Sequence, residues 1–351
     1  MRVVFCWQTI SGYMASCWKA LGSREGIDLH VIAKAPGGAA DFDPAIMGGV
    51  RHELFSQAQL DDPSLMLPKI VAAEPDVLVT CGWASKSWPA AARYRGLAGV
   101  PMIMAMDTPY RGTLRQKLGR LAMRRYLSRI ARCFVAGERT RQLALALGID
   151  RSKIRLSTYG FDESAFAPTA ATRRPGAPER SFLFVGRYAP AKGLDTLLDA
   201  YGMYRSRVED PWSLICCGKG EFAPQIRAAE GVTDAGFVQP SELPTRLAAA
   251  SVFVLASHYE PWGVVVAEAA ASGMPVVCTD AVGASIDIVR PYTSGLVVPE
   301  ADAGALSEAL AWMHGRPERV HAMGQAAAVF ASAYAAPVWA ERWHAAIEDV
   351  A

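Results

Sequence analysis

The chain has 351 residues, of which 51% are hydrophobic and 20% charged. This composition excludes a disordered or fibrous protein, and the length favours about two domains. The net charge of +2 conceals an asymmetry, because residues 1–165 hold 22 Lys and Arg against 14 Asp and Glu, whereas residues 166–351 hold 14 against 20. We therefore expect the first half to meet an anionic surface or ligand.

The seven cysteines indicate a reducing compartment. Their number is odd, they show no zinc-type spacing, and Cys6 and Cys216 lie in apolar, strand-like runs. Such cysteines are typical of buried free thiols. No stretch approaches the roughly 20 apolar residues that span a bilayer, and the first ten residues turn polar too early for a signal peptide. The sequence predicts a cytoplasmic protein, with peripheral attachment to the inner face of the membrane left open.

The first half of the chain alternates strand-like and helical stretches. Continuous apolar strands separated by amphipathic helices indicate a parallel sheet that is covered on both faces. We therefore predict that residues 1–167 form a doubly wound, Rossmann-like α/β domain. Its strands are predicted at residues 2–7, 29–35, 76–83, 101–107 and 132–138.

A second α/β domain is predicted at residues 181–330, after a linker rich in Pro, Ala and Arg at 168–180. Residues 331–351 are expected to form a helix that packs across the domains. Ligands of open α/β sheets bind beyond the carboxyl ends of the strands, so the predicted site faces an interdomain cleft. The predicted strands of the second domain are 181–187, 212–221, 235–238, 251–257, 274–280 and 294–300.

The loop that follows the first of these strands has the features of a phosphate site. Gly186 ends the strand, Arg187 and Lys192 lie in the loop, and a helix begins near Leu194. Free N–H groups and the dipole at a helix N-terminus attract anions, and Arg187 and Lys192 would add positive charge. The Gly-Lys-Ser/Thr of a Walker A loop is absent. On this pattern alone, an ordinary solvated loop fits equally well.

Glu260 and Glu268 stand in a second strand–loop–helix segment, HYEPWGVVVAEAAASGMPVV. A helix turns by about 80° over eight residues, so the two acids are expected to have separate roles. The spacing alone slightly favours a structural interpretation, in which Glu268 pairs with a nearby arginine and Glu260 is a solvated cap. A ligand that meets both carboxylates is the alternative.

The order of these motifs resembles that of the retaining nucleotide-sugar glycosyltransferases of family 4, which have the GT-B fold. Glu260 to Glu268 is similar to the E-x7-E signature of that family. The resemblance is specific over the C-terminal half and loose over residues 148–168, where Tyr159 replaces the usual Asn. Other similar segments are V-G-R…K-G at 185–193, G-K-G at 218–220, G-F-V at 236–238 and the closing segment 282–299, with Asp287 where Glu is common.

The resemblance implies a role for each matching residue. Glu268 would bind the donor ribose, Glu260 would lie by the transferred sugar, and Arg187 and Lys192 would stabilise the leaving diphosphate. The donor would be a UDP- or GDP-sugar, with no metal ion or cofactor needed. The acceptor would be a glycan or a lipid-linked molecule of cell-envelope, exopolysaccharide or glycolipid synthesis. The expected donor-binding residues also include Gly12, Gly186, Gly218, Lys219, Phe237, Val238, Trp262, Gly263 and Val264.

The N-terminal half departs from the family pattern. It has Gly12 alone where a Gly-Gly pair is common, and Asp107 where many members carry a histidine. Asp107 is a candidate for orienting the donor sugar or for accepting the acceptor's proton, and a helix N-cap is an equally good explanation. Two alternatives stay open, a GT-B-fold sugar-nucleotide epimerase and a non-catalytic nucleotide-sugar-binding protein.

Residues 111–132 hold eight Lys and Arg and no acid. We expect one amphipathic helix here, either packed on its sheet or docked on an anionic membrane or a phosphorylated acceptor. Nucleic acid is not an expected partner, since no interleaved aromatic platform accompanies the charge. The predicted apolar stripe consists of Leu114, Leu118, Leu121, Leu127 and Ile130.

Overall fold

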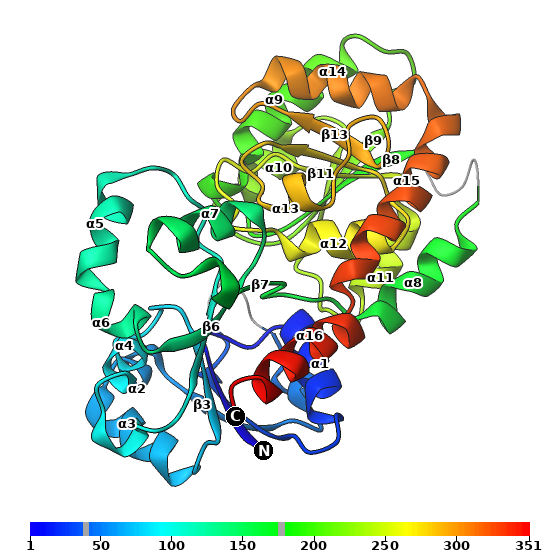
Figure 1. Cartoon of the computed structure of the whole chain (residues 1–351). Helices are drawn as coiled ribbons and strands as arrows, with labels where there is room; N and C mark the ends of the chain where they lie inside the picture. Colours follow the sequence, from blue (N-terminus) through cyan, green and yellow to red (C-terminus); the bar gives the residue numbers. More distant parts are fainter. Residues whose placement is uncertain (38–41, 175–179) are drawn as a thin grey trace. The chain divides into compact units, whose positions relative to one another are not determined.

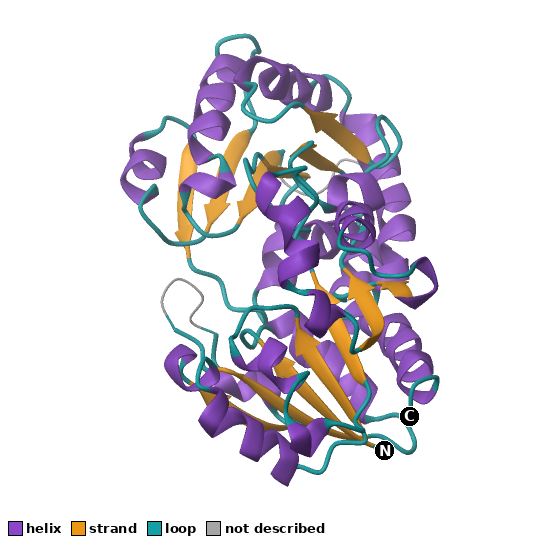
Figure 2. Ribbon diagram, turned by 60° about the vertical axis from the view of Figure 1, so that its left-hand side comes forward, coloured by secondary structure: helices purple, strands orange, loops and turns teal. Residues whose placement is uncertain are grey.

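The structure is a computed structural model that describes residues 1–37, 42–174 and 180–351. It divides into two compact units, one formed by residues 1–161 with 336–351 and the other by residues 162–335. Each unit is built on one parallel sheet with helices around it (Figure 1, Figure 2). The prediction of two Rossmann-like α/β domains is therefore confirmed.

The first unit has a seven-stranded sheet in the order β3-β2-β1-β4-β5-β6-β7, with every neighbouring pair parallel. The order reverses between β1 and β4, the kind of position at which α/β sheets bind ligands. Five strands coincide with the predicted ones. The strands are β1 (Arg2–Trp7), β2 (Asp28–Lys34), β3 (Arg51–Phe55), β4 (Val77–Cys81), β5 (Met102–Met106), β6 (Ile130–Val135) and β7 (Ile154–Leu156).

The helices of the first unit correct the prediction for residues 111–132. Instead of one helix, two short helices meet at Met123, and Ile130 begins β6. The predicted stripe of five apolar residues is therefore not continuous. The helices are α1 (Gly12–Gly22), α2 (Gln57–Leu60), α3 (Pro63–Ala72), α4 (Ser87–Ala91), α5 (Leu114–Ala122), α6 (Arg124–Leu127), α7 (Glu138–Ala146) and α16 (Ala336–Glu348).

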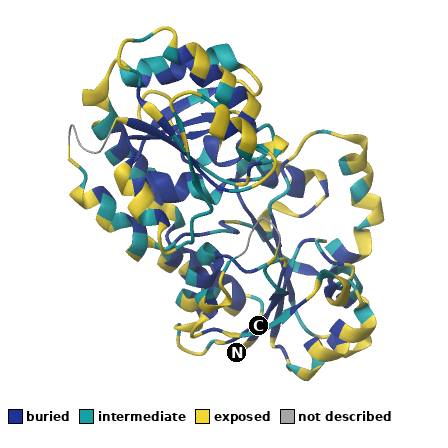
Figure 3. Cartoon of the chain, turned by 180° about the vertical axis from the view of Figure 1, so that it is seen from behind, coloured by how far each residue is buried: buried dark blue, intermediate teal, exposed yellow. Residues whose placement is uncertain are grey.

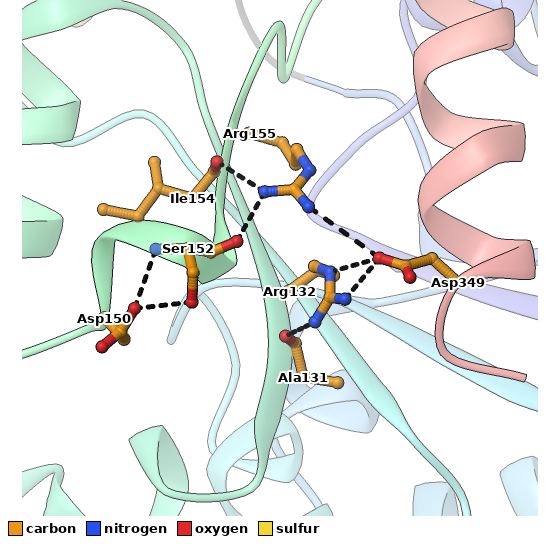
Figure 4. Close-up of polar contacts among 7 residues, drawn as sticks. All are labelled: Ala131, Arg132, Asp150, Ser152, Ile154, Arg155 and Asp349. Carbon is orange, nitrogen blue, oxygen red and sulfur yellow. Dashed lines mark hydrogen bonds and ion pairs between the residues drawn. The ribbon is translucent and has the colours of Figure 1, made fainter.

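Helix α16 completes the core of the first unit. Trp339 and Trp343 are fully buried, and the Trp343 ring stacks on Phe134 with 3.8 Å between centroids. Asp349, just beyond the helix, accepts hydrogen bonds from Arg132, with Nε at 2.9 Å (Figure 4). Both tryptophans belong to the core of the first unit, and the helix predicted to span both domains is grouped with that unit.

The second unit has a six-stranded sheet in the order β10-β9-β8-β11-β12-β13, which reverses between β8 and β11. All its neighbouring strands are parallel. All six predicted strands are present. They are β8 (Ser181–Val185), β9 (Ser213–Cys217), β10 (Val232–Gly236), β11 (Val252–Leu255), β12 (Val276–Thr279) and β13 (Gly295–Val298).

The predicted linker at 168–180 is partly helical. Helix α8 ends at Thr172. The guanidinium of the next residue, Arg173, donates to the carbonyls of Leu247 and Ala250 at 2.7 Å. Residues 175–179 of the predicted linker lie outside the described residues. The helices of the second unit are α8 (Glu163–Thr172), α9 (Leu194–Arg205), α10 (Ala223–Ala228), α11 (Leu243–Ala249), α12 (Val264–Ala271), α13 (Ala284–Asp287), α14 (Ala303–His314) and α15 (Pro317–Ala331).

Candidate functional site

Two loops of the second unit meet at the carboxyl ends of β8 and β11, where its strand order reverses. The backbone N–H groups of His258 and Tyr259 donate to the Ala191 carbonyl at 3.0 and 3.1 Å. Gly193 has a φ of +61°, and a Cβ there would lie 1.9 Å from the carbonyl oxygen of Ala256. Only glycine fits this contact. The structure thus brings together the two motifs that the sequence singles out.

Lys192 and Glu260 form an ion pair across these loops. Their side chains are only 15% and 12% exposed, so the pair is largely removed from water. Arg187 is exposed on the same loop as Lys192. The loop therefore offers one exposed guanidinium and one partly buried ammonium, a combination suited to phosphate oxygens.

The glycines after β8 and β9 allow close backbone contact. A Cβ on Gly218 would lie 1.9 Å from the Gly186 carbonyl oxygen, and the Gly218 N–H donates to the Gly236 carbonyl at 2.7 Å. Beside them, Lys219 lies over the Phe237 ring, 5.0 Å from its centroid, and Val238 follows half-buried. These predicted donor-binding residues and the phosphate loop lie side by side along one edge of the sheet, beyond the carboxyl ends of its strands.

Tyr188 is a residue of this edge that sequence reasoning missed. Its buried hydroxyl donates to the Cys216 carbonyl at 2.8 Å and lies 2.9 Å from Asp234 Oδ1. Burial raises the pKa of Tyr188, which keeps the hydroxyl protonated as a donor. Tyr188 therefore fixes the loop between Gly186 and Lys192, and no motif in the sequence distinguishes it from an ordinary aromatic residue.

Glu268 lies on α12, which begins at Val264 immediately after Gly263, whose φ is +95°. Its side chain is buried, and burial together with the nearby charge of Asp162 raises the pKa of Glu268 to about 7. Among the described residues, no side chain forms a hydrogen bond or ion pair with its carboxylate, so the expected pairing with an arginine does not occur. A buried carboxyl without a protein partner is costly unless a ligand meets it.

The Trp262 side chain, by contrast, has a structural contact. It is fully buried, its Nε1–H donates to Asp287 Oδ2 at 2.9 Å, and its ring centroid lies 4.8 Å from that of Tyr334. Asp287 thus has a definite role where the family pattern has Glu. The Trp262–Asp287 bond holds the loop that contains Trp262 and Gly263, two of the predicted donor-binding residues.

Trp262→Phe is expected to lower the free energy of unfolding by about 2 kcal/mol, because a buried hydrogen bond to a charged acceptor is lost. Urea unfolding of both proteins measures this difference. Asp287→Asn is the matched control, since an amide oxygen still accepts from the indole. A Trp262→Phe variant as stable as wild type would contradict a structural role for this bond.

The first unit has a separate pocket at its own strand reversal. Gln8, Cys81–Ala84 and Ala105–Thr108 line a pocket of about 160 Å³ beyond the ends of β1, β4 and β5. Asp107 Oδ2 accepts from the Tyr159 hydroxyl at 2.7 Å, and burial raises the pKa of Tyr159, which remains a donor. Trp83, an exposed aromatic residue that sequence reasoning missed, also lines it.

The positions of Asp107 and Gly12 in the structure bear on the predictions made for these two residues. Asp107 is not a helix N-cap, because Thr113 caps α5 and accepts from the Gln116 N–H. Gly12 is the first residue of α1, next to Ser11, whose hydroxyl caps the helix by accepting from the Met14 N–H at 3.4 Å. Gly12 is not among the residues that line the pocket.

Comparison with protein-family models gives two matches, one in each half of the chain. Residues 10–160 match the model of the glycosyl transferase 4-like domain, and residues 172–330 match that of glycosyl transferases group 1. Together these segments contain Asp107, the phosphate loop, Glu260 and Glu268.

Similar proteins include glycosyltransferases of several kinds. D-inositol 3-phosphate glycosyltransferase of Streptomyces griseus is 34% identical over 228 residues, which cover 58% of this chain and 48% of the relative. D-rhamnosyltransferase WbpZ of Pseudomonas aeruginosa is 27% identical over 324 residues, 86% of this chain and 81% of the relative. The chain spans less than half the length of the first curated relatives it matches.

The fold is also found in solved structures. HepE of Anabaena, determined in complex with UDP, has a TM-score of 0.77 at 18% identity, with 99% of this chain and 100% of that chain covered. Sucrose-phosphate synthase of Thermosynechococcus elongatus has a TM-score of 0.74 at 18% identity, with 99% of each chain covered. The two halves of the chain thus match two glycosyl transferase domain models, and its fold is of the GT-B type.

Proposed function

We propose that the protein is a retaining glycosyltransferase of family 4 that moves a sugar from a UDP- or GDP-sugar to a glycan or lipid-linked acceptor. The observation that carries this proposal is the buried, unpartnered carboxyl of Glu268 in the same unit as the Arg187–Lys192 loop. Ribose hydroxyls would give that carboxyl the hydrogen-bond donors it lacks, while the loop would take the diphosphate.

The chemistry needs stabilisation of the leaving group above all. As the bond between the sugar carbon C1 and the phosphate oxygen breaks, its electron pair passes to the diphosphate, and Arg187 and Lys192 stabilise that charge. The acceptor oxygen attacks C1 on the face that the diphosphate leaves, and its proton passes to the departing phosphate oxygen. The anomeric configuration is then retained. The two cations take the role that a metal ion plays elsewhere, so turnover proceeds without added divalent metal.

Glu260 is paired with Lys192 across the two loops. In the proposed complex, the diphosphate meets Lys192 and the Glu260 carboxylate turns to the hydroxyls of the transferred sugar. The ion pair holds the two side chains in place between the loops that carry them.

The pocket of the first unit supports binding of an uncharged sugar by that unit. Trp83 offers an exposed aromatic surface on which a sugar ring can stack, and Asp107 accepts hydrogen bonds from hydroxyl groups. A phosphate group would be repelled by the Asp107 carboxylate. We assign the pocket to a sugar of the acceptor or of the donor, in the synthesis of cell-envelope glycans, exopolysaccharides or glycolipids.

Two measurements test the proposed function. A thermal-shift screen with UDP-, GDP- and ADP-sugars identifies the donor, because a ligand that binds only the native state raises the melting temperature. NMR of the transfer product, with and without EDTA, then reports the anomeric configuration. An inverted product, or turnover abolished by EDTA, would contradict the mechanism. Binding without transfer to any glycan or lipid acceptor would favour the non-catalytic alternative, and a changed sugar in the recovered donor would favour the epimerase.

A further inference from the structure

Helix α5 of the first unit presents an apolar stripe to solvent. Leu114, Leu118 and Leu121 are 76%, 63% and 73% exposed, and their spacing of i, i+4 and i+7 places them on one face. No residue of α5 is buried (Figure 3). Three neighbouring leucines on a helix face normally pack against a core, so this stripe is exposed for a reason other than folding.

The opposite face of the helix is the one that packs on the protein. Gln116 and Gly119 are half-buried, and a Cβ on Gly119 would lie 3.3 Å from the Leu147 side chain beyond α7. Next along the chain, Tyr126 anchors α6 with a hydroxyl that donates to the Gly82 carbonyl at 2.8 Å. Consecutive helices α5 and α6 are thus held on the unit from one side (Figure 1).

Cations flank the leucine stripe on both sides. Arg115 lies on one side and Lys117 on the other, whereas Arg120 lies nearer the packed face, where a Cβ on Gly148 would be 2.9 Å from its Nε; all three are exposed. Residues 108–137 contain no acidic residue, and no described residue forms an ion pair with these three cations. The exposed Arg124 and Arg125 of α6 extend the positive charge. Leucines 114, 118 and 121 with Arg115 and Lys117 are called the α5 face below.

We propose that the α5 face binds the surface of an anionic lipid bilayer. The helix lies in the plane of the interface, the three leucines enter the boundary between head groups and acyl chains, and the cations meet lipid phosphates. A bilayer fits the α5 face, because its surface places anionic head groups directly beside apolar acyl chains along the whole length of a helix. Among the described residues, no helix is long and apolar enough to cross a membrane, so the contact is peripheral.

This inference stands apart from the proposed function. It depends on surface residues of α5 and not on Glu268, Arg187 or Lys192, so either can fail alone. If both hold, the α5 face keeps the enzyme at the surface where lipid-linked acceptors are found.

Co-sedimentation of the full chain with vesicles tests the proposal. Wild-type protein is expected to bind vesicles of phosphatidylglycerol and phosphatidylcholine, and to bind pure phosphatidylcholine vesicles at least about tenfold more weakly, as electrostatic attraction to the surface is lost. Raising the salt from 0.05 to about 0.5 M should weaken binding to the anionic vesicles, since the charges are screened.

The variant Leu114→Ser/Leu118→Ser/Leu121→Ser isolates the apolar contribution. Its affinity for anionic vesicles should fall at least about tenfold because three apolar side chains no longer enter the interface. Val329→Ser is the matched control, as Val329 is 71% exposed on α15 of the second unit. The triple variant should keep the circular dichroism spectrum and the melting temperature of the wild-type protein, which shows that it is folded.

Three outcomes would overturn the proposal. These are failure of wild-type protein to bind anionic vesicles, equal binding to neutral and anionic vesicles, and undiminished binding by the triple leucine variant. A loss of binding in Val329→Ser as large as in the triple variant would also count against the α5 face. If the α5 face bound an acidic protein but not anionic vesicles, the face would be assigned to a protein partner instead.

Discussion

Glu268→Gln is expected to raise the stability of the ligand-free protein at pH 8 while weakening donor binding. The carboxyl is buried, and its pKa in the folded protein is raised from 4.5 to about 7. The folded state therefore holds a proton that the unfolded chain releases above pH 4.5. Charging the carboxyl in the folded protein at pH 8 costs on the order of 3 kcal/mol, and the neutral glutamine avoids that cost.

The direction of the pKa shift of Glu268 determines the pH range in which wild type and Glu268→Gln differ in stability. Because the folded pKa lies above the unfolded one, the native state is favoured at low pH and loses this contribution as the pH rises from 4.5 through about 7. Urea unfolding should therefore show a small difference between wild type and Glu268→Gln at pH 5 and a large one at pH 8. Glu300→Gln, an exposed acid, should show no such difference.

Glu268→Gln should bind the donor more weakly than wild type, although it is more stable. A carboxylate that accepts two ribose hydroxyls binds them more strongly than a neutral amide, so the dissociation constant of the nucleotide should rise about tenfold or more. Titration calorimetry with the donor found in the thermal-shift screen measures it. A variant that is more stable at pH 8 and binds the nucleotide as tightly as wild type would remove Glu268 from the donor site.

Arg187→Ala and Lys192→Ala are both expected to reduce turnover by a factor on the order of 10² to 10³, because each removes one cation from the leaving group. Their effects on stability should differ. Arg187 is exposed, so its loss should leave the free energy of unfolding unchanged. Loss of Lys192 leaves the partly buried Glu260 without its partner, which should destabilise the protein by about 3 kcal/mol.

The double variant Lys192→Met/Glu260→Gln separates these effects. It removes both charges of the ion pair, so it should regain most of the stability lost in Lys192→Ala without regaining turnover. Initial rates should be recorded with and without divalent metal for every variant. Wild-type turnover in Arg187→Ala and Lys192→Ala would refute the assignment of the phosphate loop, and rescue of either variant by added metal would contradict the proposal that two cations suffice.

The sequence predicts the strands well wherever a run is apolar enough to be buried. The two missed strands are edges of the first sheet, where β3 reads Arg-His-Glu-Leu-Phe and β7 has only three residues. Their side chains face water or neighbours of mixed polarity, so no apolar run marks them. The prediction of one helix over residues 111–132 was wrong for a related reason, because the helical periodicity of the sequence continues past Met123 into residues that belong to β6.

Site residues could be predicted when chemistry and spacing recur as a pattern. Glu260, Glu268 and Lys192 are singled out in this way, but the ion pair of Lys192 with Glu260 is not predicted. Tyr188 and Asp287 act through contacts with residues about 25 or more positions away in the sequence. Trp83 can be recognised as a candidate only from the pocket that it lines. Such contacts arise from folding and leave no local pattern.

The return of the chain to its first unit has a consequence for biosynthesis. The core of that unit includes Trp339 and Trp343, which the ribosome adds after all of residues 162–335. The second unit can thus complete its sheet during synthesis while one face of the first sheet still lacks its cover. We therefore expect the first unit, although it is N-terminal, to complete its core after the second, because α16 is the last of its helices to be synthesised.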